Sequence, residues 1–233
     1  MTNQISVIEL RKLKSFSELD NNQIQRISQC MVRRNYAPGQ FIFLEGDDST
    51  GLWFILDGKV KIIKQSSSGR MQGLCLVDSG KCFGSCPLFD SGDSNPADAQ
   101  ALTDVVLAVI PRQRIQELIY SDVSIATTLL EIYHDRMDLL AKLGECLGTW
   151  TVGMRINDCL IAHAETSADV QQVKLTHEDI ATLVGTAREV VSRHLAELES
   201  INIIKCHPNV ISLLEINALK TPCTAERASA NTL

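Results

Sequence analysis

Long hydrophobic runs are absent from this chain, and aromatic residues make up only 5% of its 233 residues. No apolar stretch approaches the roughly 20 residues that a membrane-spanning helix needs. Residues 1–16, MTNQISVIELRKLKSF, lack the basic segment, apolar stretch and small-residue cleavage site of an export signal. These absences argue against an integral membrane protein and predict a cytoplasmic protein without a membrane partner.

Catalytic signatures are also missing. The sequence contains no C-x-x-C, no H-E-x-x-H, no G-x-S-x-G elbow and no phosphate-binding Walker loop. Its 45% hydrophobic and 21% charged residues are typical of globular domains, and the length suffices for two of them. Eight cysteines without an export signal favour free thiols or metal ligands over a disulfide framework. We therefore expect a protein that is not an enzyme.

Positive charge is scarce as well. The chain has 22 basic and 28 acidic residues, which give a net charge of -6. A negative protein has no general attraction to phosphate, so a nucleic-acid partner requires a focal patch of basic side chains. The candidates for such a patch are Lys174, Arg188, Arg193 and Lys205, with His194 and His207 nearby.

The most informative segment that is present spans residues 175–204, LTHEDIATLVGTAREVVSRHLAELESINII, and predicts two short helices joined at Gly185. Two threonine–acid pairs have the spacing of helix caps: Thr176 with Asp179, and Thr186 with Glu189. Apolar residues at helical spacing give each helix a buried side: Ile180, Leu183 and Val184 in the first, and Val191, Leu195 and Leu198 in the second. This pattern favours a helix-turn-helix.

Four polar residues lie on another side of the second helix, within its first two turns: Arg188, Glu189, Ser192 and Arg193. A recognition helix in a major groove presents its base-contacting side chains there. Arginine can pair with guanine O6 and N7, glutamate can accept from cytosine N4, and serine can bond bases or phosphates. We predict these four as DNA-binding residues, together with Thr186 in the turn and with Lys174 and Lys205 at the flanks.

The run TAREVVSRHLAELESINII resembles the recognition-helix signature of the Crp/Fnr superfamily of bacterial transcription regulators, an R-E-x-x-x-R or E-x-x-S-R core followed by L-x-x-L-E-x-x-x-(I/L)-I. Residues 203–205 and 210–213, around the turn formers His207, Pro208 and Asn209, predict the two strands of a wing. The resemblance implies a winged helix-turn-helix, a palindromic promoter site on double-stranded DNA, and RNA polymerase as a partner.

Residues 36–110 predict short antiparallel strands, because glycine or Pro-Gly signals recur every several residues. The clearest predicted hairpin is LWFIL-DG-KVKII, in which Asp57 and Gly58 supply a tight turn. Strands of this kind leave both an enzyme and a binding shell open. The pattern from Gly46 through Trp53 to Gly84 is similar to the cyclic-nucleotide-binding β-roll, the sensor half of the same superfamily.

Residues 121–150 contain no proline and predict one helix about 40 Å long. Its apolar stripe can pack onto the β-roll of the same chain or form a coiled coil with a second chain. The resemblance implies the second arrangement, a homodimer. The predicted interface consists of Ile125, Leu129, Ile132, Leu139, Leu140, Leu143 and Leu147.

The resemblance makes cyclic nucleotides the default effector, and the residues argue against them. Nucleotide-binding members carry F-G-E and R-(S/T)-A motifs, whereas Ser85 here stands in place of the glutamate and residues 95–97, Asn-Pro-Ala, in place of the second motif. There is no arginine in residues 71–111, and Leu140 and Ala141 stand where hydroxyl groups would face the base. A buried phosphate needs a charged partner, so we expect an effector other than cyclic AMP.

Sulfur is available near the same loop, in Cys75, Cys82 and Cys86. Thiolates suit a metal ion or an iron–sulfur cluster, and paired thiols can form a regulatory disulfide. Haem, a metal, a redox signal and a small molecule all remain open, as does the plain alternative that these cysteines are small buried residues. The predicted effector or redox candidates are therefore Cys75, Cys82, Cys86, Ser85 and Leu140, and no metal or cofactor is assigned.

The predicted fold is α+β: an N-terminal antiparallel, jelly-roll-like β-roll, a long dimerisation helix and a C-terminal winged helix-turn-helix. The expected domains are an effector-sensing β-roll over residues 1–120, the helix over 121–150, the DNA-binding domain over 151–219 and a disordered tail over 220–233. The predicted function is a homodimeric transcription regulator. Two alternatives stay open: a thiol redox or metal-binding protein with a structural helical domain, and a regulator that responds to cyclic nucleotides.

Overall fold

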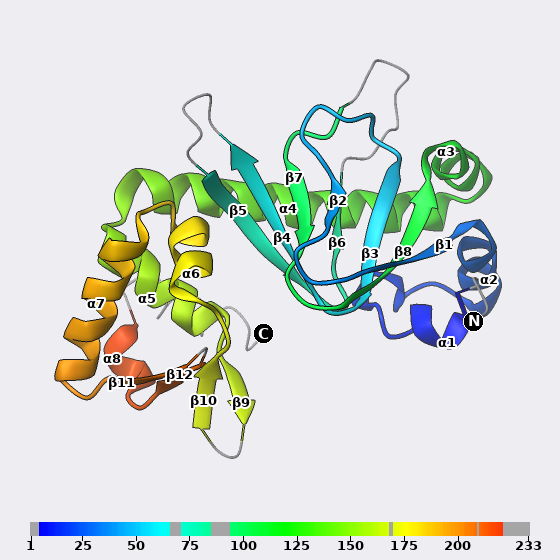
Figure 1. Cartoon of the computed structure of the whole chain (residues 1–233). Helices are drawn as coiled ribbons and strands as arrows, with labels where there is room; N and C mark the ends of the chain where they lie inside the picture. The colour runs from blue at the N-terminus through cyan, green and yellow to red at the C-terminus, as the bar shows by residue number, and fades with distance from the viewer. Residues whose placement is uncertain (1–4, 66–70, 85–93, 168–169, 209, 221–233) are drawn as a thin grey trace. The chain divides into compact units, whose positions relative to one another are not determined.

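The structure is a computed structural model that describes residues 5–65, 71–84, 94–167, 170–208 and 210–220 (Figure 1). The chain divides into two compact units, one made of Met1–Arg70 and Leu74–Ala141 and the other of Met71–Gly73 and Lys142–Leu233. No helix in the described ranges is long and apolar enough to cross a membrane. The predicted tail lies outside these ranges, except for Lys220.

The first unit is built on a β-roll of two four-stranded sheets. One sheet has the order β1 (Val32–Tyr36), β8 (Val105–Pro111), β3 (Gly51–Asp57) and β6 (Cys82–Phe83), and the other has the order β2 (Phe41–Phe43), β7 (Asp98–Ala101), β4 (Lys59–Gln65) and β5 (Met71–Asp78). β1, β3 and β8 pair in antiparallel fashion, as do β2, β4 and β7. The predicted antiparallel β-roll is confirmed.

The predicted hairpin across Asp57 and Gly58 is wrong, because the two strands that flank this turn belong to different sheets. β3 pairs with β6 and β8, whereas β4 lies between β7 and β5. Gly58 has a φ of +94°, and a Cβ at this position would lie 2.3 Å from the carbonyl oxygen of Asp104. The glycine therefore turns a corner of the roll, where a side chain would collide with the start of β8.

Strand β3 is buried on both faces, which explains its unbroken apolar run. Leu52 and Phe54 point into a core that is covered by helices. Trp53 and Ile55 point into the core between the two sheets. Since successive side chains of a strand alternate between its faces, one strand supplies both cores.

Helices cover one face of the sheet that contains β3. They are α1 (Val7–Leu10), the short 3-10 helix η1 (Lys14–Phe16), α2 (Asn21–Cys30), α3 (Arg112–Ser121) and the 27-residue α4 (Val123–Thr149), which passes behind the strands in Figure 1. The single long helix expected over residues 121–150 is confirmed.

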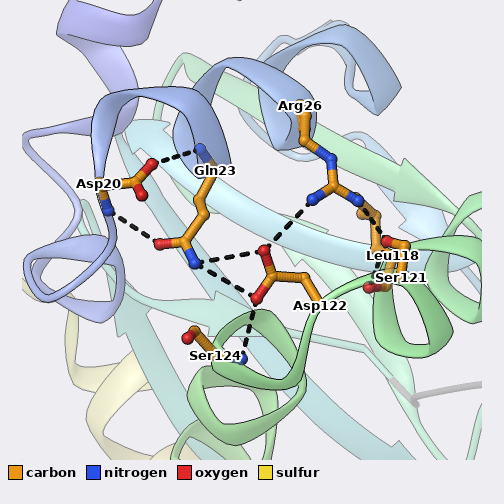
Figure 2. A network of polar contacts seen from close by, with 7 residues as sticks. All are labelled: Asp20, Gln23, Arg26, Leu118, Ser121, Asp122 and Ser124. Carbon is orange, nitrogen blue, oxygen red and sulfur yellow. Dashed lines mark hydrogen bonds and ion pairs between the residues drawn. The ribbon is translucent and has the colours of Figure 1, made fainter.

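A polar network anchors the beginning of α4 to α2 (Figure 2). The carboxylate of Asp122 accepts hydrogen bonds from Gln23 Nε2 at 3.2 Å, from Arg26 Nη1 at 3.2 Å and from the backbone N–H of Ser124 at 2.9 Å. Partial burial opposes ionisation, but the bonds from Gln23 and the α4 backbone, together with the charge of Arg26, hold the pKa of Asp122 below its ordinary value. Asp122 therefore stays charged and fixes where the long helix starts.

The second unit contains α5 (Val152–Ala162), α6 (His177–Val184), α7 (Arg188–Ser200) and α8 (Ile216–Leu219). Its sheet has the order β11 (Ile204–His207), β12 (Val210–Leu213), β10 (Val170–Val173) and β9 (Glu165–Ser167). β11 and β12 form the predicted wing, in which Ile204 faces Leu213. The β9–β10 hairpin was not predicted, because its short polar strands carry little alternation of apolar residues.

Candidate nucleic-acid interface and effector site

The turn between α6 and α7 depends on the left-handed backbone conformation of Gly185. Thr176 caps α6 and forms the predicted capping box with Asp179, whose backbone N–H lies 3.1 Å from Oγ1 of Thr176. Gly185 ends α6 in the left-handed region, with φ at +73°, and its N–H donates to the carbonyl of Ala181 at 2.9 Å. A left-handed residue after a helix favours glycine, and this one directs the chain into α7.

The predicted cap of α7 by Thr186 is wrong. The N-cap is Ala187, and no side chain bonds the first turn of the helix. The N–H of Thr186 donates instead to the carbonyl of Ala181, across the end of α6, at 2.9 Å. Thr186 thus belongs to the closing turn of α6, one residue too early to cap α7. It lies half-buried in the turn.

Arg155 of α5 braces the same turn and was not singled out from the sequence. Its Nη1 donates to the carbonyl of Val184, in the last turn of α6, at 2.7 Å. The last carbonyls of a helix have no partner within the helix, and a cation near that end is stabilising. Arg155 is therefore a structural support for the turn that orients α7.

The exposed side of α7 carries the predicted base-contacting residues. Arg188, Glu189 and Arg193 are exposed and form no hydrogen bond or ion pair with any residue that the structure describes. The opposite side of the helix is buried through Val191, Leu195 and Leu198. Three charged side chains are thus held on a rigid helix while remaining available to a partner.

Ser192 differs from these neighbours. It is half-buried, and its Oγ lies 2.9 Å from Nδ1 of His177, the first residue of α6. His177 was not among the predicted site residues, since nothing in the linear sequence links it to a residue fifteen positions later.

The basic patch is smaller than the sequence predicted. Lys174 is exposed and pairs with Glu165 at 3.5 Å, while Lys205 is exposed on β11. His194 adds little positive charge at neutral pH, because burial lowers its pKa below the ordinary value of 6.5, although the charge of Glu197 acts in the opposite direction. Its Nε2 lies 2.9 Å from Oδ1 of Asn157. The free positive charge therefore comes from Arg188, Arg193 and Lys205.

Helix α4 divides the predicted dimer residues into two groups. Ile125, Leu129 and Ile132 are buried in the helix-covered core of the first unit, so the prediction that they face a second chain is wrong. Leu139, Leu140 and Leu147 are exposed, and Leu143 is half-buried. The N-terminal half of the apolar stripe is thus used within the chain.

A second stripe of α4 is largely exposed, with Ala126 and Tyr133 half-buried in it, and has the spacing of a coiled coil. Residues alternate three and four positions apart: Val123, Ala126, Leu130, Tyr133, Met137, Leu140, Gly144 and Leu147. Leu130 is 64% exposed, Met137 68% and Leu140 57%. Leu130 and Met137 were missed, although a strict heptad count of the sequence could have found them.

Aromatic side chains fill part of the interior of the roll. Trp53 stacks on Phe83 at 6.2 Å between ring centroids, and Phe43 lies 6.2 Å from Trp53 and 6.0 Å from Phe83. Phe43 and Trp53 also line an open groove of about 420 Å³, whose exposed polar residues include Arg34 and Asp48. The first unit therefore offers aromatic surface beside a few charged groups.

The two candidate cysteines that the structure describes, Cys75 and Cys82, pack against different cores. Cys75 packs against the core between the sheets, whereas Cys82 packs against the helix-covered core. Burial raises the pKa of Cys75, and it raises the pKa of Cys82 to about 11, so both thiols are protonated at neutral pH. Ser85 and Cys86 lie outside the described residues. Within the described ranges, no three His, Cys, Asp or Glu side chains form a group that could hold a metal ion.

The two units match two known protein families. The family model described as "Cyclic nucleotide-binding domain" matches residues 33–122, and that described as "Crp-like helix-turn-helix domain" matches residues 154–221. The cAMP-activated global transcriptional regulator CRP of Haemophilus influenzae is 28% identical over 79% of this chain and 84% of its own. The cAMP-activated global transcriptional regulator Vfr of Pseudomonas aeruginosa is 29% identical over 86% of this chain and 94% of its own. The chain belongs to the Crp/Fnr superfamily.

A solved structure supports the same fold. CLP of Xanthomonas campestris, a c-di-GMP responsive global regulator, superposes with a TM-score of 0.73 at 24% identity, over 83% of this chain and 99% of that chain. As a Crp/Fnr member, the protein combines a β-roll, a long helix and a winged helix-turn-helix, as the sequence predicted. It is a DNA-binding transcription regulator of the Crp/Fnr type, and its named relatives are regulators rather than enzymes.

In this Crp/Fnr chain, the long helix brings a cation to Gly84, beside the predicted effector loop. Arg136 of α4 donates from Nη1 to the carbonyl of Gly84 and lies with its guanidinium 5.6 Å from the ring centre of Tyr133. Its charge also partly offsets the effect of burial on the pKa of Cys75 and of Cys82. The absence of arginine from residues 71–111 therefore did not reveal that Arg136, from another element, reaches Gly84.

Proposed function

We propose that the protein is a homodimeric, sequence-specific transcription regulator that reads a palindromic promoter site through α7. The observation that carries this proposal is the set of Arg188, Glu189 and Arg193, exposed and without partners among the described residues, on a helix fixed by Gly185 and Arg155. Ser192, Thr186, Lys174 and Lys205 complete the proposed DNA-binding set. Such a protein works beside the chromosome in the cytoplasm, with RNA polymerase as its further partner.

Dimerisation supplies the second recognition helix. The heptad stripe of α4, with exposed Leu130, Met137, Leu140 and Leu147, has the pattern that two helices bury against each other in a parallel coiled coil. A symmetric dimer presents two copies of α7 to half-sites about 34 Å apart, one turn of DNA. In this proposal residues 1–120 sense the effector, residues 121–150 join the two chains and residues 151–219 bind DNA.

The effector we propose is a small molecule other than cyclic AMP. Asn95 stands where nucleotide-binding members have the arginine that pairs with phosphate; it is 2% exposed and carries no charge. Leu140 offers no hydroxyl to a base. The protonated thiols of Cys75 and Cys82 weigh against a redox or metal signal. The named effectors of relatives differ, cyclic AMP for CRP and Vfr and c-di-GMP for CLP, so this fold accommodates more than one kind of ligand.

A regulator that responds to cyclic nucleotides is the second candidate, and one observation favours it. Arg136 brings a guanidinium to Gly84, at the end of the described part of the loop. Titration calorimetry separates the two candidates. We expect no heat of binding with cyclic AMP or cyclic GMP at micromolar concentration. Micromolar binding of cyclic AMP that also strengthens DNA binding would establish the second candidate.

Selection from a pool of random DNA duplexes tests the DNA-binding function. We expect a two-fold symmetric motif whose half-sites contain a TGA core, the preference that the E-x-x-S-R form implies. Arg193→Ala should weaken binding by about 1–3 kcal/mol and relax the preference at one guanine. Lys205→Ala should weaken binding to all DNA sequences equally, because a lysine that contacts phosphate does not distinguish bases. Wild-type protein that selects no symmetric motif contradicts the proposed function.

A further inference from the structure

Ser192 is bound to another helix of the same domain through His177. The Oγ of Ser192 and Nδ1 of His177 lie 2.9 Å apart, and both side chains are half-buried. His177 begins α6, whose N-cap Thr176 and C-terminal Gly185 both have defined hydrogen bonds. The imidazole therefore approaches Ser192 from a fixed element. The other predicted base-contacting residues on α7 have no such tie within the described ranges.

The bond restricts what the serine hydroxyl can offer to a base. A free hydroxyl rotates, and it has one hydrogen to donate and two lone pairs that accept. If Nδ1 accepts, the hydrogen of Ser192 is used, and only lone pairs remain for the amino groups of adenine or cytosine. If Nδ1 carries a hydrogen and donates, the hydroxyl hydrogen remains available to guanine or to O4 of thymine. The tautomer of His177 thus decides which base edges Ser192 can bond.

We propose that His177 is a specificity-determining positioning residue, which fixes the rotamer of Ser192 and its role as donor or acceptor toward the base. The inference rests on the proposed function, since it requires that α7 enters a groove of DNA. His177 needs no contact with DNA for this role. It acts through Ser192, so its substitution should change the preferred sequence and not merely the overall affinity.

The experiment compares base preferences of full-length variants in the same random-duplex selection. His177→Phe keeps a flat ring but removes the hydrogen bond, and Ser192→Ala removes the hydroxyl. Both should lose about three- to tenfold of discrimination, the effect of one hydrogen bond, at the same base pair of each half-site. The double variant should lose no more than either single one. His177→Gln, which can again bond the hydroxyl, should restore part of the preference.

Glu178→Gln is the matched control. Glu178 is the next residue of α6, is exposed, and its side chain forms no bond with α7 within the described ranges. This variant should keep the wild-type motif while its overall affinity rises modestly, because it removes a negative charge near phosphates. Circular dichroism and the thermal midpoint check that each variant is folded.

Three outcomes would overturn the inference. The first is a folded His177→Phe protein that keeps the wild-type preference at every position. The second is a His177→Phe protein whose affinity falls equally for all sequences and falls again in the Ser192→Ala background. The third is a Ser192→Ala protein with unchanged preference, which tests the idea without touching His177. If wild-type protein selects no motif at all, the proposed function fails instead.

Discussion

Charge placed on the exposed stripe of α4 should separate the two chains of the proposed dimer. The informative pair of variants is Leu140→Glu and Leu139→Glu, the same change at adjacent positions. Leu140 is 57% exposed and lies in the heptad stripe, whereas Leu139 is 48% exposed and lies outside it. Because successive helical residues point about 100° apart, only Leu140 should face a second helix.

The expected size of the effect follows from the exposed area of Leu140. Full burial of a leucine stabilises by about 1.5–3 kcal/mol, so burying its exposed part gives about 1–1.5 kcal/mol for each chain. Two-fold symmetry doubles this to about 2–3 kcal/mol. Leu140→Glu loses that contribution and sets two carboxylates against each other in a partly dry interface. The dimer Kd should therefore rise about a hundredfold or more, at about 1.4 kcal/mol for each tenfold step.

Sedimentation velocity over a concentration series measures this change directly, and circular dichroism verifies the helix content. We expect Leu140→Glu to be monomeric where wild type is dimeric, with loss of affinity for the selected DNA site. Leu139→Glu should shift the dimer Kd by less than about threefold, since surface charges contribute little. Equal effects of the two variants, or a Leu140→Glu protein as dimeric as wild type, would show that the two chains meet elsewhere.

Two further predictions concern acid stability. The hydrogen bond from Arg33, followed by that from the Ser6 backbone, lowers the pKa of Glu9 from 4.5 to about 2, so its stabilising effect is present above pH 4.5 and is lost as the pH falls toward 2. Glu9→Gln should cost about 1 kcal/mol at neutral pH, allowing for solvent screening, and almost nothing near pH 2, as measured by denaturant unfolding. Burial lowers the pKa of His194 below 6.5. Above pH 6.5 the side chain is neutral in both the folded and the unfolded chain. Below that pH the free energy of unfolding falls, because the unfolded chain takes up a proton more readily than the folded one. His194→Gln should flatten the fall in the unfolding midpoint between about pH 7 and about pH 5; an unchanged slope would refute this assignment.

Much of the DNA-binding domain follows from the local chemistry of the chain. Thr176 caps the start of helix α6 and Gly185 caps its end, because a capping pair and a glycine act on neighbouring residues. The same locality explains the long helix and the wing. Where two local signals competed, the sequence misled: Thr186 has the spacing to cap α7, but it lies in the turn that closes α6, and the N-cap position of α7 falls one residue later, at Ala187.

The sequence could not show that the strands on either side of Asp57 and Gly58 belong to different sheets. A tight turn between two apolar runs is compatible with a hairpin and with a corner between sheets, because the turn residues are the same in both. Only the pairing of β3 with β8, a strand much later in the chain, decides between them. A similar separation in sequence hid Arg136, which reaches Gly84 from another element.

The sequence by itself thus determined the family, the order of the elements and the identity of the charged residues on α7, since these depend on spacing along one helix or turn. Tertiary structure alone decided which face of α4 is already buried, that Ser192 is held by His177, and that burial lowers the pKa of His194. Each of these depends on burial or on a partner many residues away. Periodicity shows that a helix has an apolar side, but only packing shows which apolar residues remain for a second chain.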